Sequence, residues 1–315
     1  MAVESRPTEG AIAITQVFHS ILVATDFSQA SRRALSSALA LALHNDARAS
    51  VVHVFGNDRP YEMPDSSSEM DREKAHWGRQ LAWIKNFEAM GKFDAVLAKQ
   101  GPVAAGILSA LDETAADLLV LGTRARGGLA KLALGSVAEE LVRTATCPVM
   151  TVGPYAEMAE NGQFHTILFA TDYGPGSARA LPLVEAISNQ EKARLVVLRM
   201  ISPMPATSGS LSAYGPAMAA ADELQEWEGS SRQHSLEELR AWIGKQSTPH
   251  PQPEYIVRID FWPEGILTAV NTAKADLIVM GANRGASPRL AAHLPWTAIH
   301  EVIRRAPCPV LTVAG

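Results

Sequence analysis

Cysteine is nearly absent from this sequence, with only Cys147 and Cys308 among 315 residues. Two distant cysteines cannot form a disulfide framework, which excludes a disulfide-rich secreted protein and favours a reducing compartment. The N-terminus has no basic start followed by an apolar core, and the most apolar helical stretch, residues 34–43, is interrupted by serines. We therefore expect a soluble cytoplasmic protein with a short frayed leader.

Basic charge is also scarce. The chain has 28 Lys and Arg against 33 Asp and Glu, a net charge of −5 and a pI near 6.0. No positive field is available to gather phosphates along a nucleic acid or to hold the chain at an anionic membrane, so we expect neither partner. The 47% of hydrophobic residues excludes long disorder. The length is about twice a typical domain of roughly 150 residues, which predicts two domains.

Several catalytic signatures are missing. The sequence contains no Gly-x-x-x-x-Gly-Lys-Ser/Thr phosphate loop, no Gly-x-Ser-x-Gly nucleophile elbow and no Cys-x-x-Cys pair. His293 and His300, with Glu301 beside them, are seven residues apart, which does not place two imidazoles on one helix face for zinc. No metal site is predicted.

The chain repeats itself. Four short segments return later in the same order: 21–26 at 167–172, 106–108 at 265–267, 116–122 at 275–281, and 147–152 at 308–313. A repeat of this length means that each half is one copy of a unit of about 140–150 residues. A polar stretch opened by Gly-Pro at 153–154 marks the boundary, giving predicted domains 1–155 and 156–315.

Within the first copy, short apolar runs alternate with longer segments of helical periodicity. The runs are nearly continuous in apolar residues, as in strands covered on both faces. This order predicts an α/β fold in which each half is a doubly wound, open, parallel sheet of five strands, Rossmann-like in connection. Ligands of such sheets bind beyond the carboxyl ends of the strands. The predicted strands are 21–25, 50–55, 93–98, 117–121 and 149–152, and the predicted helices are 31–43, 70–90, 103–113 and 136–144.

The first predicted strand ends in Thr25-Asp26, with Ser28 or Ser31 able to cap the next helix. Asp26 can accept hydrogen bonds from a ribose or a base. The alternative is a purely structural role, in which Asp26 satisfies backbone amides in the turn.

The fourth predicted strand runs into a longer motif that begins at Gly122 and ends at Gly135-Ser136. The two glycines allow close approach of a ligand or a positive φ, and the helix after Gly135 offers free N–H groups to a phosphate. Arg124 and Arg126 add positive charge. The alternative is a tight connection with a solvated pair of arginines.

These residues carry a family resemblance. A strand ending in Ala-Thr-Asp, a late Gly-x-x-(Gly)-x9-Gly-Ser motif followed by Val-Ala-Glu, and then Cys-Pro-Val resemble the universal stress protein family, here as a tandem pair. The resemblance implies the adenine nucleotide alpha hydrolase-like fold and ATP, with or without Mg, as cofactor. It also implies the binding residues: Thr25 and Asp26 for adenine and ribose, the Val54 backbone for the base edge, Gly122 for the ribose side, the segment Arg124, Ala125, Arg126 and Gly127 of the motif loop, and Gly135, Ser136 and Val137 for the phosphates.

Two departures from the family motif stand out. Ala125 occupies the position of the second motif glycine, where a Cβ costs on the order of 1–2 kcal/mol if a positive φ is required. Gly127 follows closely and could relieve that strain. In the second copy, Trp296-Thr297 align with Gly135-Ser136, and a tryptophan would fill the space that phosphates need. The C-terminal motif is therefore predicted to be degenerate or specialised.

These features predict an ATP-binding protein with a regulatory, stress-response role and its nucleotide in the N-terminal half. Because no residue of the motif is an obvious general base, any ATP hydrolysis should be slow. The alternative is an interaction scaffold of the same fold that binds no nucleotide. Segments 149–152 and 310–313 are predicted edge strands. The resemblance implies that they pair across a dyad, either with each other or with a second chain, giving an intramolecular pseudo-dimer or a homodimer.

Overall fold

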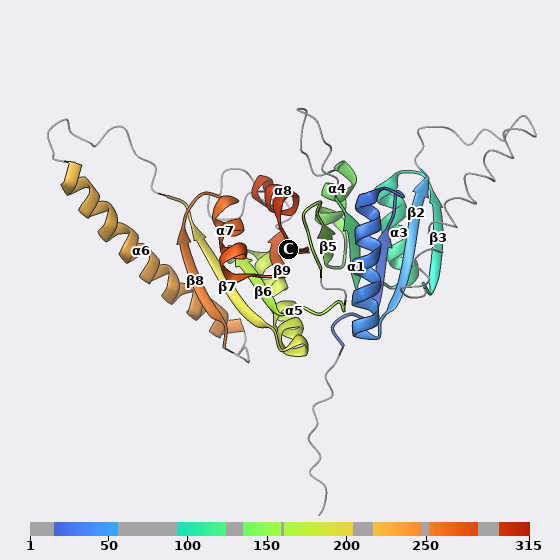
Figure 1. Cartoon of the computed structure of the whole chain (residues 1–315), viewed down its shortest axis with the longest axis horizontal. Coiled ribbons are helices and arrows are strands. Elements are labelled where there is room, and N and C mark those ends of the chain that lie inside the picture. Colours follow the sequence, from blue (N-terminus) through green and yellow to red (C-terminus); the bar gives the residue numbers. More distant parts are fainter. Residues whose placement is uncertain are drawn as a thin grey trace, which may run out of the picture.

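The computed structural model of the chain describes residues 16–55, 93–123, 135–158, 161–203, 217–246, 252–282 and 296–315. Its described strands form one ten-stranded sheet in the order β3-β2-β1-β4-β5-β10-β9-β6-β7-β8, with β8 toward one end of the molecule and β3 toward the other (Figure 1). The strands are β1 Ser20–Ala24, β2 Arg48–Phe55, β3 Ala95–Gln100, β4 Leu118–Gly122, β5 Val149–Val152, β6 Thr166–Thr171, β7 Arg194–Ile201, β8 Glu254–Ile259, β9 Leu277–Ala282 and β10 Val310–Ala314.

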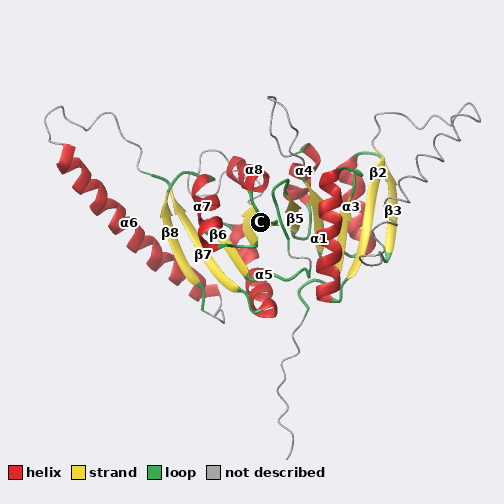
Figure 2. Ribbon diagram, viewed as in Figure 1, coloured by secondary structure: helices red, strands yellow, loops and turns green. Residues whose placement is uncertain are grey.

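Helices cover both faces of the sheet (Figure 2). One face packs against α1, α5 and α6, and the other against α3, α4, α7 and α8. Each of the two cores between helices and sheet contains buried residues from both halves of the chain. The helices are α1 Gln29–Asn45, α3 Val103–Thr114, α4 Ser136–Thr144, α5 Pro175–Glu191, α6 Ala217–Gln246, α7 Glu264–Ala273 and α8 Trp296–Arg305.

The predicted α/β fold is confirmed, and each half contributes five parallel strands in the same relative order. The predicted helix 70–90 lies outside the described residues. Strands β1 and β4 are buried along nearly their whole length, as their continuous apolar runs indicated. In β3 every second residue is exposed, because this strand lies at the edge of the sheet.

The two halves meet where β5 and β10 run antiparallel. The pairing is reciprocal: the Thr151 hydroxyl donates to the Val310 carbonyl at 3.2 Å, and the Thr312 hydroxyl donates to the Val149 carbonyl at 3.1 Å. These four residues are equivalent in pairs through the internal repeat, so a pseudo-dyad passes through the junction. Of the two arrangements that the sequence left open for these edges, the structure shows pairing within the chain. The two predicted five-stranded sheets are thereby joined into one.

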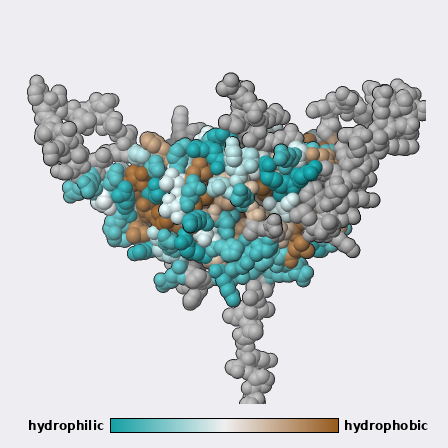
Figure 3. Space-filling view, viewed as in Figure 1, coloured by the Kyte–Doolittle hydropathy of each residue, from teal (hydrophilic) through white to brown (hydrophobic). Residues whose placement is uncertain are grey.

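The visible surface carries mostly hydrophilic side chains, with smaller hydrophobic patches between them (Figure 3). The large hydrophobic residues that are exposed in the described part of the chain are Leu43, Val96, Tyr155 and Phe261. None of the described helices combines the length and apolar character needed to span a bilayer.

Candidate functional site

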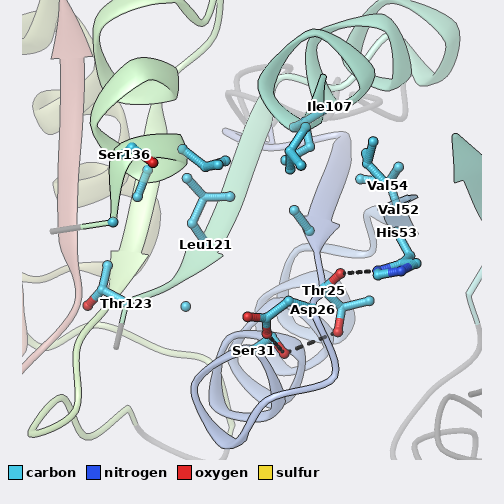
Figure 4. Close-up of a pocket in the computed structure, with 16 residues that line it drawn as sticks. Thr25, Asp26, Ser31, Val52, His53, Val54, Ile107, Leu121, Thr123 and Ser136 are labelled. Carbon is cyan, nitrogen blue, oxygen red and sulfur yellow. Dashed lines mark hydrogen bonds between the residues drawn. The ribbon is translucent and has the colours of Figure 1, made fainter. Parts of the chain in front are cut away.

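A cavity of about 530 Å³ lies at the carboxyl ends of the N-terminal strands. Side chains from β1, β2, α3, β4 and the start of α4 surround it, as Figure 4 shows. Its volume falls within the roughly 300–1,000 Å³ that small-molecule sites occupy. The cavity is lined by Ala24, Thr25, Asp26, Ser31, Val52, His53, Val54, Val103, Ile107, Leu121, Gly122, Thr123, Gly135, Ser136, Val137 and Ala138.

The turn after β1 is held by a hydroxyl–carboxylate network. The Asp26 Oδ1 atom accepts hydrogen bonds from the Ser28 backbone N–H at 3.0 Å and from the Ser31 hydroxyl at 2.9 Å. The Thr25 hydroxyl in turn donates to Ser31 Oγ at 3.1 Å. Ser28 is the N-cap of α1. Asp26 therefore has the structural role that the sequence left open, because it accepts hydrogen bonds within the turn. The same residue is exposed and lines the cavity.

His53 is a cavity residue that the sequence motifs did not reveal. Its Nδ1 donates to the Thr25 carbonyl at 2.7 Å, so this nitrogen carries a hydrogen. The ring lies between those of Phe27 and Phe55, with centroid distances of 4.6 and 4.5 Å. These contacts fix the end of β2 against the turn after β1. The signal available in the sequence was only its position beside Val54 at a strand end.

One end of the cavity is apolar because α3 packs tightly on β2. A Cβ added to Gly106 would lie 2.7 Å from a methyl group of Val54, so glycine is needed at this contact. Val54, Ile107 and Leu121 are all buried residues that face the cavity. This end suits a flat, apolar group.

The two motif glycines have different roles. A Cβ on Gly122 would lie 2.4 Å from the carbonyl carbon and oxygen of Ala30, so Gly122 lets the end of β4 meet the start of α1. Among the described residues, nothing lies within 4 Å of a Cβ added to Gly135. Neither residue has a positive φ. Of the two roles that the sequence left open for these glycines, Gly122 therefore serves close approach of backbone and not a positive φ.

Helix α4 begins at Ser136 as predicted, and its N-cap, Gly135, has no side chain to accept a hydrogen bond from the first amides. A helix start of this kind presents N–H groups and a partial positive charge. Ser136 is exposed and its hydroxyl lies at the cavity (Figure 4). The arrangement can accept an anionic group.

Thr123 is a second cavity residue that the sequence motifs did not single out. Only 3% of it is exposed, and its Oγ1 has no hydrogen-bond partner among the described residues. A buried hydroxyl without a partner is uncommon and costs about 1–3 kcal/mol. Its position directly after Gly122 was the available signal.

The predicted site residues that the structure describes all come together at this cavity. They are Thr25, Asp26, Val54, Gly122, Gly135, Ser136 and Val137. The others, Arg124, Ala125, Arg126 and Gly127, lie outside the described residues.

The corresponding turn in the C-terminal half is closed. The Ser177 hydroxyl donates to Asp172 Oδ1 at 2.7 Å, and the Gly174 N–H donates to the same atom at 2.8 Å. Asp172 is only 2% exposed, whereas Asp26 is exposed. The carboxylate therefore keeps its role in the turn and is sealed from solvent.

The C-terminal half carries larger side chains at two equivalent positions of its apolar end. Met200 stands where the N-terminal half has Val54, and Trp262 stands at the position of Val103. Met200 is buried and its terminal methyl group packs on Gly265, and half-buried Trp262 packs against the same core.

Metal and thiol chemistry gain no support from the described residues. They contain no group of three or more His, Cys, Asp and Glu side chains that could hold a metal ion. Burial raises the pKa of Cys147 to about 11 and that of Cys308 to about 12. Both thiols are therefore protonated at neutral pH and act as small apolar groups.

The fold and the cavity define a tandem α/β protein with a ligand pocket at the strand ends of its first half. The model of the Universal stress protein family matches residues 18–153 and again residues 163–314. The chain belongs to this family, with two copies of the domain.

The chain is similar to several known universal stress proteins. A universal stress protein of Thermus aquaticus, encoded in the QAH/OAS sulfhydrylase 3′ region, is 37% identical over 142 residues, which is 43% of this chain and 99% of that protein. A universal stress protein from Archaeoglobus fulgidus has a similar fold over 95% of this chain and 97% of its own, with a TM-score of 0.62 and 21% identity. A universal stress protein solved in complex with cAMP matches 43% of this chain and 97% of its own, at 22% identity and a TM-score of 0.35.

Proposed function

We propose that the N-terminal half binds ATP and that the protein acts as a nucleotide-dependent regulator, not as a fast catalyst. The observation that carries this proposal is the cavity itself: one apolar end, one carboxylate and one open helix start meet around about 530 Å³ of space. Each of the three matches one part of an adenine nucleotide.

The apolar end would hold the base. Val54, Ile107 and Leu121 provide buried hydrocarbon on several sides of a planar ring. Stacking an aromatic base there removes apolar surface from water, which contributes about 25 cal/mol per Å².

Asp26 and the start of α4 would hold the ribose and the phosphates. Asp26 lies at the rim of the cavity, where a carboxylate oxygen accepts hydrogen bonds from ribose hydroxyls. The N-cap of α4 is a glycine and so provides no side-chain cap, and no described residue lies within 4 Å of a Cβ added there. A magnesium ion carried by the phosphates is compatible with this arrangement.

The C-terminal half would bind no nucleotide in the equivalent place. Met200 and Trp262 replace the smaller Val54 and Val103, and Asp172 is buried. We propose one nucleotide per chain, with the C-terminal half acting as a permanent structural partner of the N-terminal half. This closed half is also the observation that favours the alternative function, an interaction scaffold independent of nucleotide.

The test is nucleotide released by acid from protein purified without added ATP, compared between wild type and Gly135→Trp. The tryptophan places bulk in the open space before α4, so we expect at least tenfold less bound nucleotide. Gly135→Ala is the matched control, because a single Cβ meets no atom of the described part of the chain within 4 Å. It should retain the nucleotide.

A melting experiment provides the second measurement. ATP at 100 times its Kd should stabilise the wild type by about 2.7 kcal/mol and Gly135→Trp much less. Equal nucleotide content in wild type and Gly135→Trp would contradict the proposed pocket. Absence of nucleotide in every variant, with no effect of ATP on melting, would instead support the scaffold.

A further inference from the structure

The contacts across the pseudo-dyad are made by different residues at equivalent positions. On the face of the sheet that carries α4 and α8, the repeat aligns Glu139 with His300. These two residues face each other across the junction, with His300 Nε2 3.7 Å from Glu139 Oε2. At this position on the dyad, each residue therefore faces the residue that the repeat aligns with it, and one is a glutamate whereas the other is a histidine.

The opposite face of the sheet repeats this pattern. The ends of α1 and α5 align His44-Asn45 with Gln190-Glu191. His44 Nε2 lies 2.8 Å from a Glu191 carboxylate oxygen, and the Gln190 side-chain amide donates to Asn45 Oδ1 at 2.7 Å. The Glu191 side chain is only 3% exposed, so its carboxylate depends on these partners.

We propose that these complementary residues make the two halves of the chain select each other over a second copy of themselves. Two N-terminal halves paired in the same way would place Glu139 against Glu139. Two C-terminal halves would place His300 against His300 and leave the buried Glu191 carboxylate beside Gln190 without an imidazole. The observed pairing is the arrangement that avoids like groups on the dyad and supplies Glu191 with a histidine.

The backbone of the junction provides no such selection. Thr151 and Thr312 are identical residues in equivalent positions and make the same hydrogen bond to the opposite strand. Met150 and Leu311, which pair between them, are both apolar and buried. A strand pair of this kind suits any combination of halves, so the choice of partner falls to the side chains on the two faces.

The test uses the full-length chain and exchanges the two residues on the dyad. His300→Glu places two carboxylates opposite each other and should lower the folding equilibrium constant by roughly 5- to 30-fold. Glu139→His places two imidazoles there and is the milder single variant. The double variant Glu139→His with His300→Glu restores one residue of each kind and should recover most of the loss, measured by urea unfolding at pH 7.

The matched control is the exchange of Glu228 and Arg232, an exposed i,i+4 pair within α6 that does not touch the junction. Its single and double variants should all lie close to wild type. Light scattering over a range of concentrations is the second readout. His300→Glu should associate with increasing concentration as the β5 and β10 edges separate, and the exchange variant should return to the wild-type mass.

Two results would overturn the proposal. One is an exchange variant as unstable as the sum of its two single variants, which would mean that the residues do not act on each other. The other is a His300→Glu variant with wild-type stability and wild-type mass.

Discussion

Single glycines decide where this cavity is tight and where it is open. Gly122 and Gly135 stand at the two ends of the same motif, yet an added Cβ meets the α1 backbone at Gly122 and no described residue within 4 Å at Gly135. The motif thus combines a packing requirement with an open approach to α4.

Substitution of these two glycines should therefore affect stability to different extents. Gly122→Ala forces a Cβ against the Ala30 carbonyl, and overpacking of this kind costs about 1–3 kcal/mol. Gly135→Ala creates no such contact with a described residue and should lose only the preference for glycine at the N-cap, about 0.5 kcal/mol. Urea unfolding of both variants measures the difference, and equal midpoints would show that the contact at Gly122 is not tight.

Thr123 provides a prediction of the opposite sign. Thr123→Val keeps the shape of the side chain and removes a buried hydroxyl that has no partner among the described residues. The variant should be at least as stable as wild type and up to about 1 kcal/mol more stable. Thermal unfolding without nucleotide is the measurement. A clear loss of stability would mean that the hydroxyl makes a hydrogen bond in the folded protein.

At the residue scale, the sequence indicated several residues of the cavity but not the contacts that surround each of them. Thr25, Asp26 and Gly135 were recognisable because motif residues stand at strand and helix ends. His53 and Thr123 were not recognisable, because their place in the cavity depends on residues of other elements. The His53 ring lies between those of Phe27 and Phe55, and Thr123 is buried where it lines the cavity.

Helices α4 and α8 link the cavity to the junction between the halves. The first residues of α4 line the cavity, and Glu139, one turn further, faces His300 on α8. Burial lowers the pKa of His300 from 6.5, and Arg143 lowers it further, while the Glu139 and Glu301 carboxylates oppose the shift.

The stability of the junction should therefore fall in mild acid. Because the pKa of His300 is lower in the folded state, the unfolded state takes up the proton first as the pH falls below about 6.5. The contribution of His300 is thus present above that pH and is lost as the pH falls through the folded pKa. The difference in unfolding free energy between wild type and His300→Gln, measured from pH 8 to 5, should decrease toward acid. A difference that grows toward acid would contradict this sign.

Elements were the level that the sequence predicted best. Strands β1, β4 and β5 follow from continuous apolar runs, and α4 begins at the predicted residue. Strand β3 was placed two residues early at both ends, because an edge strand lacks the continuous run that marks a central one.

The whole molecule is a single sheet with two cores that both cross the pseudo-dyad. Each core contains buried side chains from the N-terminal and the C-terminal half. Loss of one half would expose apolar surface of the other, so the two halves should unfold together.

Hydrogen exchange followed by mass spectrometry tests this cooperativity. Peptides from β1 and β4 in one half and from β6 and β9 in the other should share the same free energy of opening in increasing urea. Saturating ATP should raise it in both halves by the same amount. Separate openings, with protection by ATP confined to the N-terminal peptides, would show two independent domains.

At this scale the repeat predicted two similar units, and the proposed division at residues 155 and 156 remains a prediction. The joining of both units into one sheet could not be predicted, because pairing of β5 with β10 depends on how two folded edges meet in space. Thr151 and Thr312 could not reveal this pairing in the sequence, because threonine is common in many strands.

A dyad inside one chain also changes what a mutation does. In a homodimer, each substitution on the pairing surface or in the pocket appears twice, so both protomers must tolerate it together. In this chain, a substitution in one half leaves the equivalent residue of the other half unchanged. The N-terminal half can keep Val54 beside its cavity while the C-terminal half carries the larger Met200 at the equivalent position, and neither residue is forced on the other half.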